Sequence, residues 1–84
     1  MKREIIYDDD KLAVETTGRS YDFIATVENK TDETIIIMFT GEYSYCDDFK
    51  IDAEEWVGIL ADDEGRDTLK AFETGDFMIT SEDY

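Results

Sequence analysis

The most constraining stretch of this sequence is the segment 34–40, Thr-Ile-Ile-Ile-Met-Phe-Thr, which is β-branched or apolar at every position. Such residues favour β-strands. A strand with apolar side chains on both faces is stable only where both faces are covered. We therefore expect this segment to be the central strand of a sheet, covered on one side by a helix and ended by Gly41.

Alternation of apolar and polar residues predicts further strands around this segment. It is present at Ile5 and Tyr7, and it extends through residues 12–16 and 21–27. Clusters of Asp, Gly and Asn between these stretches predict turns. Residues 43–51 predict one more strand, interrupted near residues 46–48 by a bulge or loop.

Helical periodicity begins after Asp52. Asp52 and Glu55 form a capping-box pattern, and apolar residues follow at helical spacing as far as Leu60. Gly65 is expected to kink or end this helix. A second helical stretch from about residue 66 is expected to end at Gly75, because glycine is the preferred residue just beyond a helix.

These elements predict an α+β fold in a single small acidic domain that spans residues 1–84. The sheet would be an antiparallel β-meander of four to five strands, with C-terminal helix or helices packed on one face. Residues 77–79 would form a last edge strand or a plug against the core. Hydrophobic residues make up 42% of the chain, which excludes a disordered acidic tail. A core this small often gains stability from a partner, so the prediction includes a homodimer.

The sequence predicts a cytoplasmic protein. Cys46 is the single cysteine, so no disulfide can form within the chain. The first residues lack the apolar core of a secretory signal. No apolar run approaches the roughly 20 residues that a membrane span needs, and we expect no membrane partner.

Charge is the strongest functional signal. Twenty-three acidic residues against eight basic ones, with no histidine, give a net charge of −15. A compact body with this charge repels itself, which lowers its stability. Residues 1–30 hold seven acids and five bases, whereas residues 31–84 hold sixteen acids and three bases. The acidic character therefore belongs to the C-terminal two-thirds; a halophilic origin would also give an acidic surface, but the retained lysines and many isoleucines disfavour it.

The sequence offers little support for catalysis or cofactor binding. The lack of histidine removes every His-based acid, base or metal arrangement, and no glycine-rich phosphate loop is present. The thiolate of Cys46 would be disfavoured by Asp47 and Asp48 beside it. The acidic runs 8–10 and 62–65 lack the spacing of a calcium loop. We therefore predict no enzyme, no cofactor and no metal site, and repulsion by phosphates opposes direct binding of nucleic acid.

Acidic residues recur from Glu42 onward at spacings that place them on shared faces. Residues two apart on a strand lie about 6.6 Å apart, and residues three or four apart on a helix about 5–6 Å. Both spacings are comparable with that of successive phosphates on a DNA strand, and lysines or arginines that bind phosphates would accept carboxylates. Two tyrosines would serve as anchors at the centre of the interface. The predicted partner-binding residues are Glu42, Tyr43, Tyr45, Asp47, Asp48, Asp52, Glu54, Glu55, Asp62, Asp63, Glu64 and Asp67.

In size, acidity and lack of catalytic residues, the chain resembles the phage-encoded DNA-mimic inhibitors, which occupy the DNA-binding cleft of host restriction, repair or CRISPR nucleases. The resemblance spans the whole chain, is compositional and rests on no motif, so it assigns no residue a role. The segment 49–56, Phe-Lys-Ile-Asp-Ala-Glu-Glu-Trp, is similar to the strand-to-helix junction of the positive-cofactor-four family of single-stranded DNA binders. The chain lacks the basic residues of that family's binding sheet, so this similarity implies a shape and not an activity.

These observations predict a non-enzymatic inhibitor that mimics DNA charge and blocks a basic DNA- or RNA-binding protein of the host, such as a nuclease, restriction enzyme or repair enzyme. If the chain is phage-encoded, as the resemblance implies, it would act in the host cytoplasm. Two alternatives stay open. One is an immunity protein that neutralises a basic toxin. The other is a small structural or regulatory module whose charge serves solubility alone.

Overall fold

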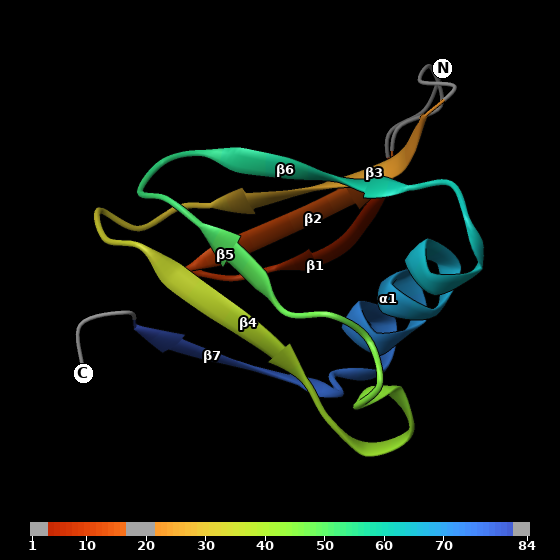
Figure 1. The fold of residues 1–84 in the computed structure, drawn as a ribbon. Helices are drawn as coiled ribbons and strands as arrows, with labels where there is room; N and C mark the ends of the chain where they lie inside the picture. Colours follow the sequence, from red (N-terminus) through yellow and green to blue (C-terminus); the bar gives the residue numbers. More distant parts are fainter. Residues whose placement is uncertain (1–3, 17–21, 82–84) are drawn as a thin grey trace.

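The computed structural model describes residues 4–16 and 22–81, which form seven strands, one α-helix and one 3₁₀ turn (Figure 1). The first sheet has the strand order β1-β2-β3-β6, and the second has the order β5-β4-β7. All strand pairs are antiparallel. The elements are β1 (Ile5–Asp8), β2 (Leu12–Thr16), β3 (Phe23–Asn29), β4 (Ile35–Phe39), η1 (Gly41–Tyr43), β5 (Phe49–Ile51), β6 (Trp56–Leu60), α1 (Asp63–Thr74) and β7 (Phe77–Ser81).

The predicted α+β class is confirmed, with antiparallel strands and a C-terminal helix packed on a sheet. The described residues form seven strands in two sheets, however, and not one meander of four to five. The difference arises after β5, where the chain turns and adds β6 to the first sheet instead of starting a helix. β7 then returns to the second sheet.

β4 is the centre of the second sheet, as the sequence predicted. It pairs with β5 on one edge and with β7 on the other. Ile35, Ile37 and Phe39 are buried, and the two residues between them are half-buried. Full burial of one such side chain contributes about 1.5–3 kcal/mol, so this strand supplies much of the core.

Helix α1 completes the core by packing Phe72 among aromatic rings from the second sheet. The ring of Phe72 lies 5.3 Å from that of Phe39 and 4.9 Å from that of Phe77, measured between centroids. Figure 1 shows α1 beside the ends of both sheets, where it also contacts β1 and β6. The helix therefore holds the two sheets together at this end of the molecule.

The helix predicted from Asp52 is wrong. The segment 52–55 is a turn in which Glu54 has a positive φ of 62°, and residues 56–60 form β6, which pairs with β3. Gly58 lies against the ring of Phe23, where a Cβ atom would approach a ring carbon to 2.4 Å. Pairing with β3 and this close approach outweigh the local capping pattern. The strand-to-helix shape implied by the similarity of segment 49–56 is therefore absent.

The second predicted helical stretch is confirmed as α1, which begins at Asp63, slightly earlier than the predicted start near residue 66. Asp62 is its N-cap residue, and the Asp62 carboxylate accepts the backbone N–H of Gly65 at 2.7 Å. Gly65 neither kinks nor ends the helix. It is buried against the carbonyl oxygen of Leu60, which a Cβ atom would approach to 1.8 Å. The predicted C-terminal cap is confirmed, because Gly75 has a φ of 84° and donates its N–H to Ala71.

The other sequence predictions concern the loop before β5, the strands β5 and β7, and the residues around position 20. The interruption near residues 46–48 is confirmed as a loop, and β7 is an edge strand rather than a plug. The strand predicted over 43–51 is reduced to the three residues of β5, because η1 and the following turn occupy its first half. The predicted turn at 17–19 and the strand position Tyr21 lie outside the described residues.

The edges of the two sheets approach each other at two places, which we call seams. The first seam lies between β5 and β6, and the second lies between β7 and β1. Fully buried Asn29 joins the sheets at the first seam. Its side-chain NH₂ donates to the carbonyl oxygens of Ile51 and Asp52 at 3.0 and 3.1 Å, and also to that of Glu33 at 2.8 Å. Its Oδ1 accepts the N–H of Thr31 at 2.9 Å. This network satisfies the amide completely and fixes where β5 leaves the second sheet.

Candidate functional site

The structure divides the twelve predicted partner-binding residues between two places. Three of them, Asp52, Glu54 and Glu55, lie at the turn between β5 and β6. The other nine lie at the far end of β6, a strand whose five residues span roughly 16 Å. We call these nine the loop–helix face; they are Glu42, Tyr43, Tyr45, Asp47, Asp48, Asp62, Asp63, Glu64 and Asp67.

Two hydrogen bonds hold the loop that follows η1 against α1. The Tyr45 hydroxyl donates to the Asp67 carboxylate. The backbone N–H of Asp47 donates to Oε2 of Glu64 at 3.3 Å. Each bond joins residues that are far apart in the sequence, so carboxylates of the loop and of the helix share one surface.

Both tyrosines of the face are neutral at physiological pH. The hydrogen bond to Asp67, with desolvation and the Asp67 charge adding to it, raises the pKa of Tyr45 to about 12. Desolvation also raises the pKa of Tyr43, and the nearby charges of Glu42, Asp67 and Asp76 raise it further. The phenols therefore add contact area without adding charge.

The carboxylates of the loop–helix face are accessible to a partner. Six of its seven acidic residues are exposed, and Asp67 is half-buried. Arg66 is the single basic residue in segments 41–48 and 61–68. It pairs with Asp63 at 3.2 Å, but both side chains are exposed, so this ion pair contributes little stability. The face therefore carries a strong excess of negative charge.

A cavity of about 350 Å³ opens at the first seam, beside the loop–helix face. Its carboxylates come from Asp47, Asp62 and Glu64, and its apolar wall includes Phe49 and Leu60. Leu60 is 54% exposed and Tyr45 on the face is 60% exposed. Acidic groups and accessible apolar surface thus occur together, which is the composition that protein interfaces use.

Sequence reasoning missed two residues here. Leu60 was expected on the buried side of a helix, and only its true position in β6 exposes it. Asp76 was not among the predicted binding residues, yet its Cγ lies 3.6 Å from where a Cβ of Gly41 would be. Its place just after the helix, where the chain returns to η1, had no local signal in the sequence.

The described residues contain no group of three or more His, Cys, Asp or Glu side chains that could hold a metal ion. Burial raises the pKa of the Cys46 thiol, so this buried residue stays protonated. Within residues 4–16 and 22–81, no helix is both long enough and apolar enough to cross a membrane. No protein-family model, curated protein or solved structure matches this chain.

Proposed function

We propose that this protein is a non-enzymatic inhibitor that presents the loop–helix face in place of DNA phosphates. Its partner would be a basic DNA- or RNA-binding protein, such as a nuclease, restriction enzyme or repair enzyme of a host cell. One observation carries the proposal: segments 41–48 and 61–68 together hold seven carboxylates and a single arginine, and two long-range hydrogen bonds join these segments. A surface this negative attracts clusters of lysines and arginines, such as those that bind nucleic-acid phosphates.

The arrangement suits a phosphate-binding site in two ways. Carboxylates three or four residues apart on α1, such as Asp63 and Asp67, are spaced like successive phosphates, and arginines can bind them bidentately. The excess charge would also steer the partner toward the face, so association would be fast and sensitive to salt. Because the loop is already bound to the helix, little ordering is needed when the partner arrives.

A second candidate, an immunity protein that neutralises a basic toxin, is favoured by the exposed apolar groups. Tyr45 and Leu60 are more than half exposed beside the acidic residues. Aromatic and aliphatic anchors of this kind give affinity for one protein surface, whereas imitation of phosphates alone does not require them. The two candidates differ in whether DNA competes with the inhibitor for its partner.

The test compares two variants of equal charge. The face variant carries Glu42→Gln, Asp48→Asn and Asp63→Asn, and the control variant carries Asp32→Asn, Glu33→Gln and Glu55→Gln; all six residues are exposed. Each immobilised protein is incubated with host lysate at low and moderate salt, with and without competing duplex DNA. Captured proteins are then identified and quantified.

We expect the wild type to capture a DNA-binding protein that duplex DNA displaces. The face variant should hold it at least about tenfold less well, a loss of about 1.4 kcal/mol, and the control variant should bind as the wild type does. Capture that DNA does not displace would favour the immunity protein. Equal losses in both variants, or no capture at either salt concentration, would overturn the proposed face.

A further inference from the structure

β7 is an edge strand without the usual protection against pairing with another chain. Among the described residues it pairs with β4 alone, in a register that is unbroken from Phe77 to Ser81. Its sequence, Phe-Met-Ile-Thr-Ser, contains no charged residue and no proline, in a chain with twenty-three acids. The facing edge strand, β1, has both a register shift and a terminal aspartate. Natural proteins use charge, proline or bulges to block free edges, so the bare edge of β7 is a candidate for strand addition.

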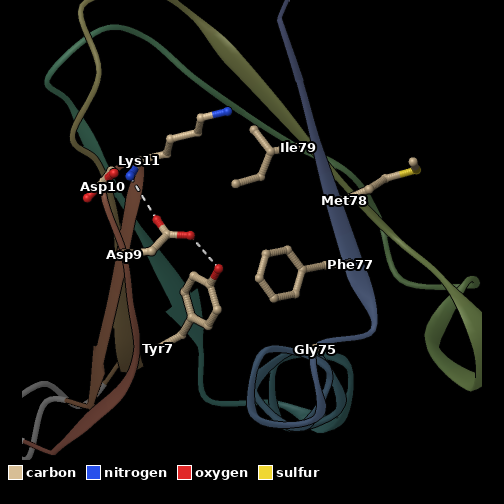
Figure 2. A pocket seen from close by; sticks show the side chains of 8 residues that line it. All are labelled: Tyr7, Asp9, Asp10, Lys11, Gly75, Phe77, Met78 and Ile79. Carbon is tan, nitrogen blue, oxygen red and sulfur yellow. Dashed lines mark hydrogen bonds between the residues drawn. The ribbon is translucent and has the colours of Figure 1, made fainter.

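The second seam leaves a cavity beside this edge. The cavity measures about 490 Å³, within the range of ordinary ligand sites, and lies between β7 and the β1–β2 hairpin. Phe77 and Ile79 line one side, and Tyr7 and Asp9 line the other (Figure 2). Figure 2 shows Ile79 pointing into the gap and Met78 pointing away from it. The rings of Tyr7 and Phe77 meet at 5.0 Å near α1, so the cavity is closed at that end.

The directions of the two strands suit one inserted strand. Figure 1 shows β2 and β7 running in opposite directions, and β1 is antiparallel to β2. β1 and β7 therefore run the same way across the seam. A strand that is antiparallel to β7 would also be antiparallel to β1, which is the favoured arrangement for short strands.

We propose that the free edge of β7, over Phe77–Thr80, receives an extended segment of another protein whose centre is apolar and whose ends are basic. Backbone hydrogen bonds to the edge would provide affinity, and alternate side chains would fill the space beside Ile79. Acidic residues near both ends of this edge are the reason to expect basic residues at the ends of the partner segment. Asp76 precedes β7, and Asp9 and Asp10 line the opposite side of the cavity, where Lys11 is the one basic lining residue.

The same charges oppose a second copy of this chain as the occupant. A second copy carries the same net charge of −15 and would bring its own Asp9, Asp10 and Asp76 to this edge. Like charges directly opposite each other destabilise a strand pair. A basic segment would meet these residues with attraction instead. The inference goes beyond the proposed inhibition, because it uses the second seam and not the loop–helix face.

The test uses three synthetic peptides with blocked ends. The first is Lys-Lys-Val-Thr-Val-Thr-Val-Lys-Lys, the second replaces every lysine by glutamate, and the third keeps the lysines but is N-methylated at alternate residues. Each is titrated into the isotopically labelled full chain while backbone amide signals and hydrogen exchange are followed by NMR. The N-methylated peptide has the same charge as the first but cannot donate all of the strand hydrogen bonds.

We expect the first peptide to bind, to shift the amide signals of β7 and β1, and to slow exchange in β7. The other two should bind at least about tenfold more weakly. The face variant described above should bind the first peptide like the wild type, so failure of the proposed function would leave this result intact. Equal binding of the lysine peptides with and without N-methyl groups, shifts confined to α1 and the loop, or no binding would overturn the inference. A dimer in sedimentation equilibrium at about 0.15 M salt whose formation slows hydrogen exchange in β7 would also overturn it, since the occupant would then be a second copy.

Discussion

Replacement of Gly65 by alanine tests the most confined contact in the fold. A Cβ atom at this position would lie 1.8 Å from the carbonyl oxygen of Leu60, whereas real Cβ atoms essentially never approach another atom closer than 3.0 Å. The end of β6 or the first turn of α1 must therefore shift by about 1.2 Å. A shift of that size also threatens the cap bond between Asp62 and the N–H of residue 65.

The opposing contributions give the expected size of the effect. Overpacking costs up to about 3 kcal/mol, and loss of the N-cap bond costs about 1 kcal/mol. The higher helix propensity of alanine offsets about 1 kcal/mol of this loss of stability. We therefore expect Gly65→Ala to lower the free energy of unfolding by about 3 kcal/mol. In a domain of this size, that lowers Tm by roughly 12–24 °C, measured by circular dichroism and confirmed by urea unfolding.

Two substitutions serve as controls for this measurement. At Gly75 an added Cβ meets nothing within 4 Å but the φ is 84°, so Gly75→Ala should cost only about 1–2 kcal/mol. Lys70 is exposed on α1, and Lys70→Ala should change the stability little. If Gly65→Ala were as stable as the wild type or more stable, helix propensity would dominate and the steric argument would be refuted.

Three further predictions follow from buried or hydrogen-bonded side chains. Asn29→Ala should lower the free energy of unfolding in urea by roughly 2–4 kcal/mol, because three backbone carbonyls lose their donor; an unchanged midpoint would contradict this. Tyr45 has a pKa of about 12 in the folded chain and about 10 when unfolded. The stability that its hydrogen bond to Asp67 contributes is therefore present in full below pH 10 and is lost as the pH rises from 10 to 12. Tyr45→Phe should therefore show a shallower loss of stability over that range, and an identical pH profile would exclude the bond to Asp67 in solution. Cys46 is buried and its pKa is raised, so iodoacetamide at neutral pH should modify it slowly in the folded chain and rapidly in urea; equal rates would show that the loop opens freely.

The part of the fold that local pattern determines was predictable. Alternation identified β2 and β3, the continuous apolar run identified the buried β4, and the glycine rule identified Gly75 as the helix cap. The segment 52–65 was not predictable in this way. Asp52 begins a capping-box pattern, but this local pattern carries no information about β3, whose edge pairs with residues 56–60. Long-range pairing outweighs local propensity there.

The two glycines of this segment show the same limit. Glycine has low helix propensity, so by local pattern alone Gly58 and Gly65 would each weaken a helix. In the structure both are sites of close approach, one to the ring of Phe23 and one to the carbonyl of Leu60. A single sequence does not distinguish a glycine that weakens an element from one that another element requires.

The acidic surface was predictable in composition and only partly in arrangement. Residues close in the sequence, such as Asp62, Asp63 and Glu64, remain together because one cap and one helical turn hold them. The association of Asp47 with Glu64 depends on how the loop folds back, which no local spacing reveals. Asp52, Glu54 and Glu55 separate from the rest because β6 is a strand, and an extended strand is more than twice as long as a helix with the same number of residues.

The central position of β4 also has a consequence for synthesis of the chain. β4 is the most apolar strand, and one of its two neighbours, β7, leaves the ribosome after all the other described strands. Until then one edge of β4 has no partner, and pairing over so long a separation forms slowly. Chains that wait with an exposed apolar edge tend to aggregate. Mutual repulsion between nascent chains of such high negative charge would keep them apart during this interval, so the acidic residues would favour folding whatever partner the protein has.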